Sequence, residues 1–166
     1  MFSSFSGDNT HIVTLQETTL LNVLQSPIEI SCFELDNKEP LRQQRFATNA
    51  IWDTGARASV ITQEVVNALK LEPTGRVTIN TASQTGIQTA TYSIILHLNT
   101  ELSIVLKRVA LGKIATNIDC LIGMDVISMG DFSVTNFENR TCMSFRFPSK
   151  HHLDYCRDPK LIIHKL

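Results

Sequence analysis

The residues best suited to chemistry are Asp53, Thr54 and Gly55, which follow the apolar pair Ile51-Trp52. A carboxylate in a tight turn after a strand can act as a general base on water, with a second, protonated carboxyl as the acid. Gly55 lets the backbone approach the carboxylate and offers its N–H, while Thr54 adds a hydroxyl. An Asp-x-Gly tripeptide is also ordinary turn chemistry, so the rest of the chain must decide between the two interpretations.

The chain carries the Asp-Thr-Gly tripeptide once. The other aspartates nearest to the apolar segments are Asp119, Asp125 and Asp131, and none lies in an Asp-Thr-Gly or Asp-Ser-Gly pattern. Two carboxyls about 3 Å apart share one proton because they cannot both ionise, and one chain supplies only half of such a pair. A homodimer with twofold symmetry is the economical way to complete it.

Strand-like segments dominate the elements that must position these residues. Alternating apolar and polar residues or short apolar runs predict strands at 27–35, 46–52, 76–81, 88–98, 102–106, 108–111, 118–122, 132–135 and 141–147. One helix is predicted at 62–71, with Thr62 as its N-cap, and one helical turn at 125–129. The fold class is therefore all-β with one or two short helices, and 166 residues suit one domain.

Four features, in this order along the chain, resemble the retropepsin family of aspartic peptidases. They are the segment AIWDTGA at 50–56, a later hairpin at 76–98, the segment DCLIGMD at 119–125 and a closing hairpin at 132–147. The helix at 62–71 is similar to one in bacterial-type, single-domain members. The resemblance implies a closed, barrel-like protomer with a flap hairpin, spanning residues 27–148 between an N-terminal extension (1–26) and a C-terminal tail (149–166).

The resemblance also implies an activity and a site. It implies an aspartic endopeptidase that is active as a homodimer on an extended peptide or protein substrate and needs no cofactor. Asp53, Thr54 and Gly55 would be catalytic, with Asp53 activating water. Substrate would be bound beside them and under the hairpin tip by Ala56, Arg57, Ala82, Ser83, Gln84, Thr85, Gly86, Ile122 and Gly123.

Two positions depart from the family pattern. Arg57 stands where retroviral members usually have aspartate, and Met124 stands where they usually have arginine. Because those family residues form a salt bridge, we expect Arg57 to meet Asp125 instead. A catalytically inactive module that binds peptide or protein is the alternative function, and a domain from a transposon-type polyprotein is a third possibility.

Composition places few further demands on function. The net charge is −1, which gives no reason to expect nucleic acid or an anionic membrane as a partner. No apolar run approaches the roughly 18 residues that span a bilayer, and the N-terminus lacks the basic and apolar regions of a secretion signal. The four cysteines form no CxxC pair and indicate neither a metal site nor a disulfide framework. We therefore expect reduced thiols in a cytoplasmic protein.

Three other residues invite a functional interpretation but have simpler ones. Trp52 is expected to pack in the core, where its indole N–H needs a partner. Cys120, beside Leu121-Ile122, is expected to be a small buried hydrophobe. His97 alternates with apolar neighbours along its strand, so we expect it to be exposed.

Overall fold

The computed structural model describes residues 10–33, 44–79, 85–114 and 117–157, which form ten strands and two short helices in these ranges. The strands are β1 (His11–Gln16), β2 (Gln25–Cys32), β3 (Phe46–Trp52), β4 (Val60–Ile61), β5 (Gly75–Ile79), β6 (Ile87–His97), β7 (Ser103–Leu111), β8 (Cys120–Ile122), β9 (Asp131–Phe137) and β10 (Arg140–Phe147). The helices are α1 (Gln63–Ala68) and α2 (Met124–Ile127). None of the described helices is long and apolar enough to cross a membrane.

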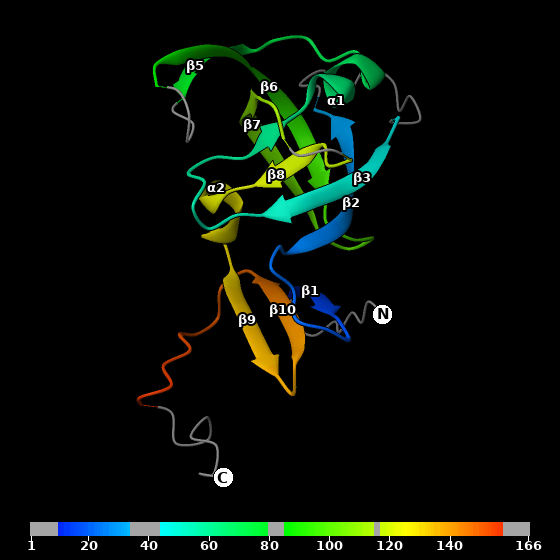
Figure 1. Cartoon of the computed structure of the whole chain (residues 1–166). Coiled ribbons are helices and arrows are strands. Elements are labelled where there is room, and N and C mark those ends of the chain that lie inside the picture. Colours follow the sequence, from blue (N-terminus) through cyan, green and yellow to red (C-terminus); the bar gives the residue numbers. More distant parts are fainter. Residues whose placement is uncertain (1–9, 34–43, 80–84, 115–116, 158–166) are drawn as a thin grey trace.

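The larger sheet closes on itself into a barrel. Its strand order is β2-β3-β8-β4-β7-β6-β5, and β2 also pairs with β6, so six of the strands form a closed ring (Figure 1). The closing seam places Glu29 opposite His97 and Ile30 opposite Leu96. β5 pairs only with β6 and lies outside the ring, so β5 and the first half of β6 form a projecting hairpin.

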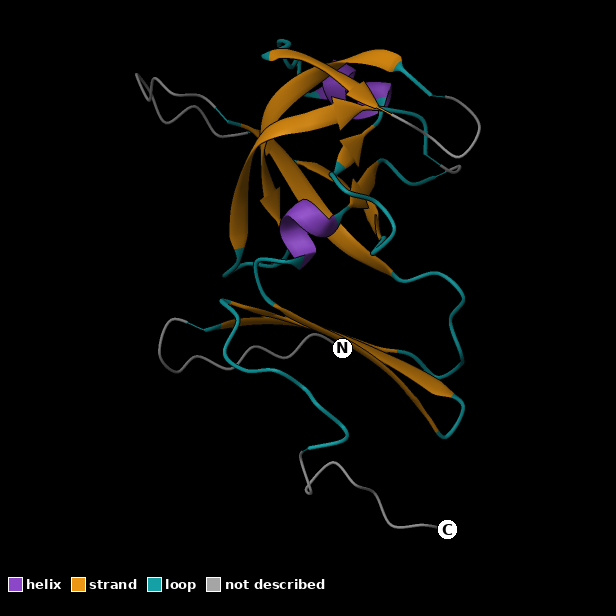
Figure 2. Ribbon diagram, turned by 90° about the vertical axis from the view of Figure 1, so that its left-hand side faces the viewer, coloured by secondary structure: helices purple, strands orange, loops and turns teal. Residues whose placement is uncertain are grey.

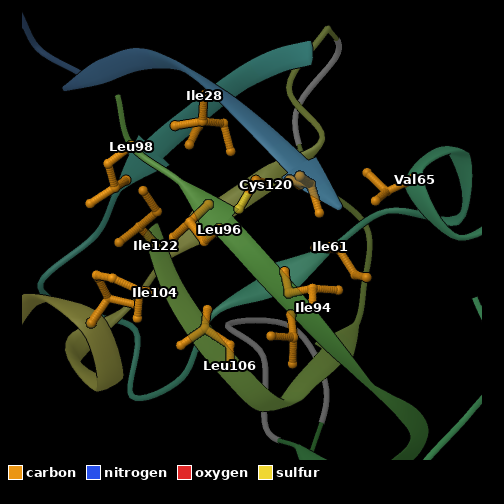
Figure 3. Packing of buried hydrophobic residues seen from close by; sticks show 14 of the residues in the cluster. Ile28, Ile61, Val65, Ile94, Leu96, Leu98, Ile104, Leu106, Cys120 and Ile122 are labelled. Atoms are coloured by element: carbon orange, nitrogen blue, oxygen red, sulfur yellow. The ribbon is translucent and has the colours of Figure 1, made fainter. Parts of the chain in front are cut away.

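The barrel interior is filled by aliphatic side chains from every part of the ring. Strand residues of alternating position point inward, because successive side chains of a strand lie on opposite faces. The fully buried members include Ile30 and Val109. Figure 3 shows others of this set: Ile61, Ile94, Leu96, Cys120 and Ile122. This packing confirms that Cys120 is a buried hydrophobe, and burial raises the pKa of its thiol to about 12, with Asp125 and Asp119 adding to the effect.

A separate three-stranded sheet lies beside the barrel, with the order β1-β10-β9 (Figures 1 and 2). Its inner face contributes Val13, Met143 and Phe145 to the same core cluster as the barrel residues. β1 belongs to the segment expected to be an N-terminal extension, and it pairs along its length with β10. This strand was not predicted from the sequence.

The expected elements are present, with differences at their ends. β3 has the predicted bounds, whereas the predicted strands at 102–106 and 108–111 are one strand, β7, which pairs with β6 on both sides of an irregularity between Tyr92 and Ile94. The helix at 62–71 is shorter, and Thr62 makes no side-chain cap. The Thr62 hydroxyl donates instead to the Asp119 carboxylate at 2.7 Å, and this charge-assisted bond is stronger than a neutral cap would be.

The prediction that His97 is exposed is wrong. Its side chain is only 7% exposed and lies between two hydroxyls, with Nε2 at 2.9 Å from Ser31 and Nδ1 at 2.7 Å from Ser103. Alternation gave the wrong result because His97 lies at the barrel seam, where its outward-pointing ring is covered by β2 and β7. Burial lowers the pKa of this imidazole, the charge of Arg45 lowers it further, and Glu29 opposes the change.

Candidate active site

Asp53 stands at the point where two parallel strands end side by side. β3 and β8 run parallel, with Trp52 opposite Ile122. The main-chain N–H of Asp53 donates to the carbonyl oxygen of Ile122 at 2.9 Å. The first residue after β3 is therefore fixed to the last residue of β8, and the Asp53 side chain begins from a rigid main chain.

The carboxylate of Asp53 is oriented by its own turn. The N–H of Gly55 donates to Oδ1 at 2.8 Å, and the N–H of Ala56 donates to the main-chain oxygen of Asp53 at 3.2 Å. The first bond was predicted from the tripeptide and is confirmed. Asp53 is half-buried, and its second carboxylate oxygen has no hydrogen-bond partner among the described residues. That oxygen is available to a water molecule or to another carboxyl.

The turn after Asp53 lies directly against the start of α2. A Cβ atom on Gly123 would lie 2.6 Å from the carbonyl carbon of Ala58, so glycine is required for this approach. The N–H of Met124 donates to the carbonyl oxygen of Ala56 at 2.8 Å. The two loops are thus joined main chain to main chain, as the Asp-Thr-Gly turn and the later apolar-Gly segment of the resemblance would require.

A buried serine and a carboxylate hold the same two loops together. Ser59 is fully buried, and its hydroxyl donates to Asp125 Oδ1 at 2.7 Å and accepts from the N–H of Gly123 at 3.1 Å. The N–H of Ser59 donates to the second oxygen of Asp125 at 3.0 Å. We refer to Ser59, Asp125 and the Gly123 N–H as the loop clamp.

The expected ion pair between Arg57 and Asp125 does not form in the described structure. Both oxygens of Asp125 accept hydrogen bonds from Ser59, and Arg57 is exposed. Ser59 and Asp125, which lie near the two departing positions 57 and 124, join the two loops instead. The sequence signal for the clamp was a serine shortly after the tripeptide and an acid two residues after Gly123, but nothing in the spacing pairs them.

Trp52, the residue before Asp53, is buried in the core, as predicted. Its indole N–H donates to the hydroxyl of Ser26 at 2.9 Å, which satisfies the buried donor. Its ring stacks on Phe132 at 5.6 Å between centroids and packs at a tilt against Phe145 at 5.3 Å. Such aromatic pairs add about 0.5–1.5 kcal/mol beyond the burial of their area. The three-stranded sheet is therefore coupled to the residue that precedes Asp53.

The structure brings most of the other predicted site residues to this region or to the projecting hairpin. Ala56 is half-buried beside Asp53, and Arg57 is exposed. Ile122 is buried in the core and reaches the site through its main-chain oxygen, while Gly123 packs under the turn.

The predicted hairpin tip is described only in part. Thr85 and Gly86 are both exposed at the start of β6, whereas Ala82, Ser83 and Gln84 lie outside the described residues. Gly86 adopts a φ of 72°, a left-handed conformation that favours glycine.

One known protein family matches the part of the chain that contains this site. The family model described as gag-polyprotein putative aspartyl protease matches residues 43–129, just over half of the chain. The chain belongs to this aspartyl protease family. The matched segment includes the Asp-Thr-Gly turn, the projecting hairpin and the loop clamp, so the resemblance found in the sequence is confirmed at the level of the family.

Among solved structures, this chain is similar to the crystal structure of a retropepsin-like aspartic protease from Rickettsia conorii. The TM-score is 0.50 and the identity is 14%, and the alignment covers 88% of this chain and 98% of that one. At this identity the similarity concerns the fold, and it confirms the predicted retropepsin-like architecture. No curated protein sequence matches the chain.

Proposed function

We propose that the chain is an aspartic endopeptidase that works as a homodimer, in which each copy contributes Asp53. The observation that carries the proposal is the state of this carboxylate. One of its oxygens is fixed by the Gly55 N–H at 2.8 Å, and the other has no partner among the described residues. A half-buried carboxylate held in this way is prepared to share a proton with a second carboxyl across a twofold axis.

The reaction follows from two such carboxyls and one water molecule. The charged Asp53 takes a proton from water as the oxygen attacks the scissile carbonyl carbon. The protonated Asp53 of the second copy gives its proton to the carbonyl oxygen, which forms a tetrahedral diol. One hydroxyl of the diol then gives its proton to the charged carboxylate as the C=O bond re-forms and the carbon–nitrogen bond breaks. The departing amine takes the proton of the other carboxyl, so the products are a carboxylic acid and an amine, and the dyad again holds a single proton.

Thr54 supports the dimeric arrangement. Its side chain is exposed, and its hydroxyl has no hydrogen-bond partner within the described protomer. A polar side chain adjacent to the half-dyad can satisfy its hydrogen bonds on the main chain of the opposite turn. We therefore propose that Thr54 joins the two Asp53 turns across the axis.

An extended peptide is the substrate that the surroundings favour. The projecting hairpin of β5 and β6 ends at the exposed Thr85 and Gly86, and Ala56 and Arg57 lie next to Asp53. Main-chain hydrogen bonds to such a hairpin give affinity for any extended segment, and side-chain contacts give selectivity. We propose that these residues and the remainder of the tip, Ala82, Ser83 and Gln84, cover the bound peptide.

We also place the protein in the cytoplasm. Cys120, Cys142 and Cys156 form no disulfide among the described residues, and Cys120 is buried while Cys142 is half-buried. Unpaired cysteines are typical of a reducing compartment.

The direct test is cleavage of a peptide library by the wild type beside Asp53→Asn. We expect the substitution to lower cleavage by at least about a hundredfold, because the general base is lost, with an unchanged circular dichroism spectrum. Asp154→Asn, the same change in the C-terminal tail, is the matched control and should retain activity. Equal cleavage by wild type and Asp53→Asn would contradict the mechanism. Peptide binding without cleavage by either would favour the binding module instead.

A further inference from the structure

Both borders of the three-stranded sheet, β1 and β9, lack a further strand partner among the described residues. Within the described residues β10 pairs with β1 on one side and β9 on the other, and β9 has no partner along its second edge. An open edge presents a row of unpaired main-chain N–H and C=O groups, which is a template for adding another strand.

The register of the β9–β10 hairpin shows which groups face outward. Glu138 and Asn139 both have positive φ, 50° and 59°, and form a two-residue turn closed by Phe137 opposite Arg140. The closing pair of such a hairpin exchanges both of its main-chain hydrogen bonds, and alternate pairs then do the same. The intervening residues of β9, namely Phe132, Val134 and Asn136, therefore direct their N–H and C=O groups toward the open edge.

The two borders of the sheet differ in their contacts with the rest of the described chain. On β1, the main-chain oxygen of Ile12 already accepts a hydrogen bond from the Asn99 side chain at 3.1 Å. β9 has no corresponding contact within the described residues. It also lacks the lysine and proline that commonly guard an exposed edge.

The residues along β9 fit a copy of the same strand. Its only charged residue, Asp131, lies at one end, where Arg146, Ser149 and the N–H of Lys150 contact its carboxylate. From Val134 to Phe137 the strand is uncharged and exposed, with Val134 37% and Phe137 68% exposed. Two copies of this segment can approach without bringing like charges together.

The open edge lies on the side of the molecule that carries Asp53. Phe132 of β9 stacks on Trp52, the residue before Asp53. In Figure 1, β3 runs toward the left-hand side, and β9 forms the left border of the smaller sheet. Figure 2, which looks onto that side, shows α2 in front with the smaller sheet seen edge-on below it. A contact along β9 would therefore bring two Asp53 turns toward one axis.

We propose that β9 pairs antiparallel with β9 of a second copy, in a register centred on Val134, so that the two small sheets become one six-stranded sheet beneath the paired Asp53 turns. This inference rests on the homodimer of the proposed function and names the surface that forms it. In this register the outward-facing groups of Phe132 and Asn136 meet each other across the axis, and the two exposed Val134 side chains cover one another.

Val134→Lys tests the proposal, with Val105→Lys as its matched control. Val105 is a valine of similar exposure, 43%, on β7, a strand that is paired on both sides in the barrel. Lysines facing each other at the axis repel, so we expect the dimer dissociation constant of Val134→Lys to rise by about tenfold or more in sedimentation experiments. Val105→Lys should match the wild type, and peptidase activity of Val134→Lys should recover at high protein concentration.

If Val134→Lys fails to fold, a crosslinking measurement tests the proposed pairing of β9 with β9 instead. Val134→Cys, made with Cys156→Ser to remove the exposed native thiol, should give a covalent dimer with a short thiol-reactive crosslinker. Phe137→Cys in the same background is more exposed but does not face itself in this register, and should crosslink far less. A wild-type dimer with unchanged dissociation in Val134→Lys, or equal crosslinking at both positions, would overturn this surface and leave the homodimer standing. A wild type that is monomeric and inactive at every concentration would overturn the homodimer itself.

Discussion

Main-chain hydrogen bonds fix the position of Asp53. The loop clamp, through the side chains of Ser59 and Asp125, holds the Asp53 turn against the start of α2. Ser59 is central to the clamp because it contacts both Asp125 and the Gly123 N–H. The retroviral pattern would have used an aspartate and an arginine here. A neutral hydroxyl against a carboxylate avoids burying an unmatched positive charge, while still making a charge-assisted hydrogen bond.

Replacing Ser59 by alanine should weaken both the fold and catalysis. It leaves the buried Gly123 N–H without its partner, which costs about 1–3 kcal/mol, and it removes one of the two hydrogen bonds to Asp125 Oδ1, the other coming from the N–H of Val126. We expect a lower free energy of unfolding in urea and a lower kcat, since Gly123 lies beneath the Asp53 turn. Ser128→Ala, at the exposed C-cap position after α2, is the control and should change stability by less than about 0.5 kcal/mol. Equal stability of the two variants would show that the clamp contributes nothing.

The sequence predicted the Asp53 turn better than the residues that support it. The tripeptide predicted the hydrogen bond from the Gly55 N–H to Asp53, because both residues lie in one turn. Trp52 and Cys120 were also placed correctly, since their burial follows from their apolar surroundings. The clamp could not be predicted, because Ser59 and Asp125 are brought together only by the pairing of β4 with β8. The exposure of His97 was predicted wrongly for a similar reason, because the strands that bury its side chain, β2 and β7, are brought beside it by pairing and not by any local sequence signal.

Among the elements, the β5–β6 hairpin is the one we expect to act on substrate. It projects from the ring, and its described tip residues are exposed. Sequence patterns predicted this hairpin and most barrel strands because alternation and turn residues are local signals. β1 was missed, although His11–Gln16 alternates, because short strands near a terminus are recognised only through the partner they pair with.

Gly86→Val should lower catalytic efficiency more than stability. Gly86 has a φ of 72°, and a Cβ atom added to it would meet no other atom within 4 Å, so the substitution strains the backbone without creating a clash. The strain lies in the hairpin and leaves the barrel core unchanged. We expect kcat/KM to fall by about tenfold or more while the melting temperature changes little. Thr100→Val, at an exposed position between β6 and β7, is the control. Equal losses of activity and stability in Gly86→Val would contradict a substrate-covering role.

His97 makes the barrel seam sensitive to pH. Its pKa is lowered from the ordinary value of 6.5, so below that pH the unfolded chain takes up a proton that the folded chain still resists. The free energy of unfolding should therefore fall as the pH drops from 6.5 toward the folded-state pKa. His97→Gln, which keeps hydrogen-bonding atoms but cannot titrate, should flatten this dependence.

Urea unfolding at several pH values between about 7.5 and 5 measures the effect. His152→Gln, on an exposed residue of the tail, is the control and should keep the wild-type slope. If His97→Gln also keeps that slope, another group is responsible for the pH dependence.

For the whole molecule, the decisive feature is that Asp53 and the open edge of β9 lie on the same side of the described chain. The family match and the similar solved structure establish the class of protein and its fold. The homodimer stays a prediction, which rests on the count of Asp-Thr-Gly tripeptides, since one carboxyl cannot form a dyad. The surface that we propose for it could not be predicted from the sequence, because the free edge of β9 is defined only once β9 and β10 have paired.

The most direct test of the central claim is to mix wild-type chains with Asp53→Asn chains. If each active site needs Asp53 from two copies, wild type at fixed concentration should lose activity as the variant is added, because each wild-type chain is captured in a mixed dimer with half a dyad. A variant that also carries Val134→Lys should inhibit much less, since it pairs poorly. We predict nearly complete inhibition at large excess of Asp53→Asn after exchange of subunits. Activity that depends only on the amount of wild type, whatever the excess of Asp53→Asn, would contradict the shared site.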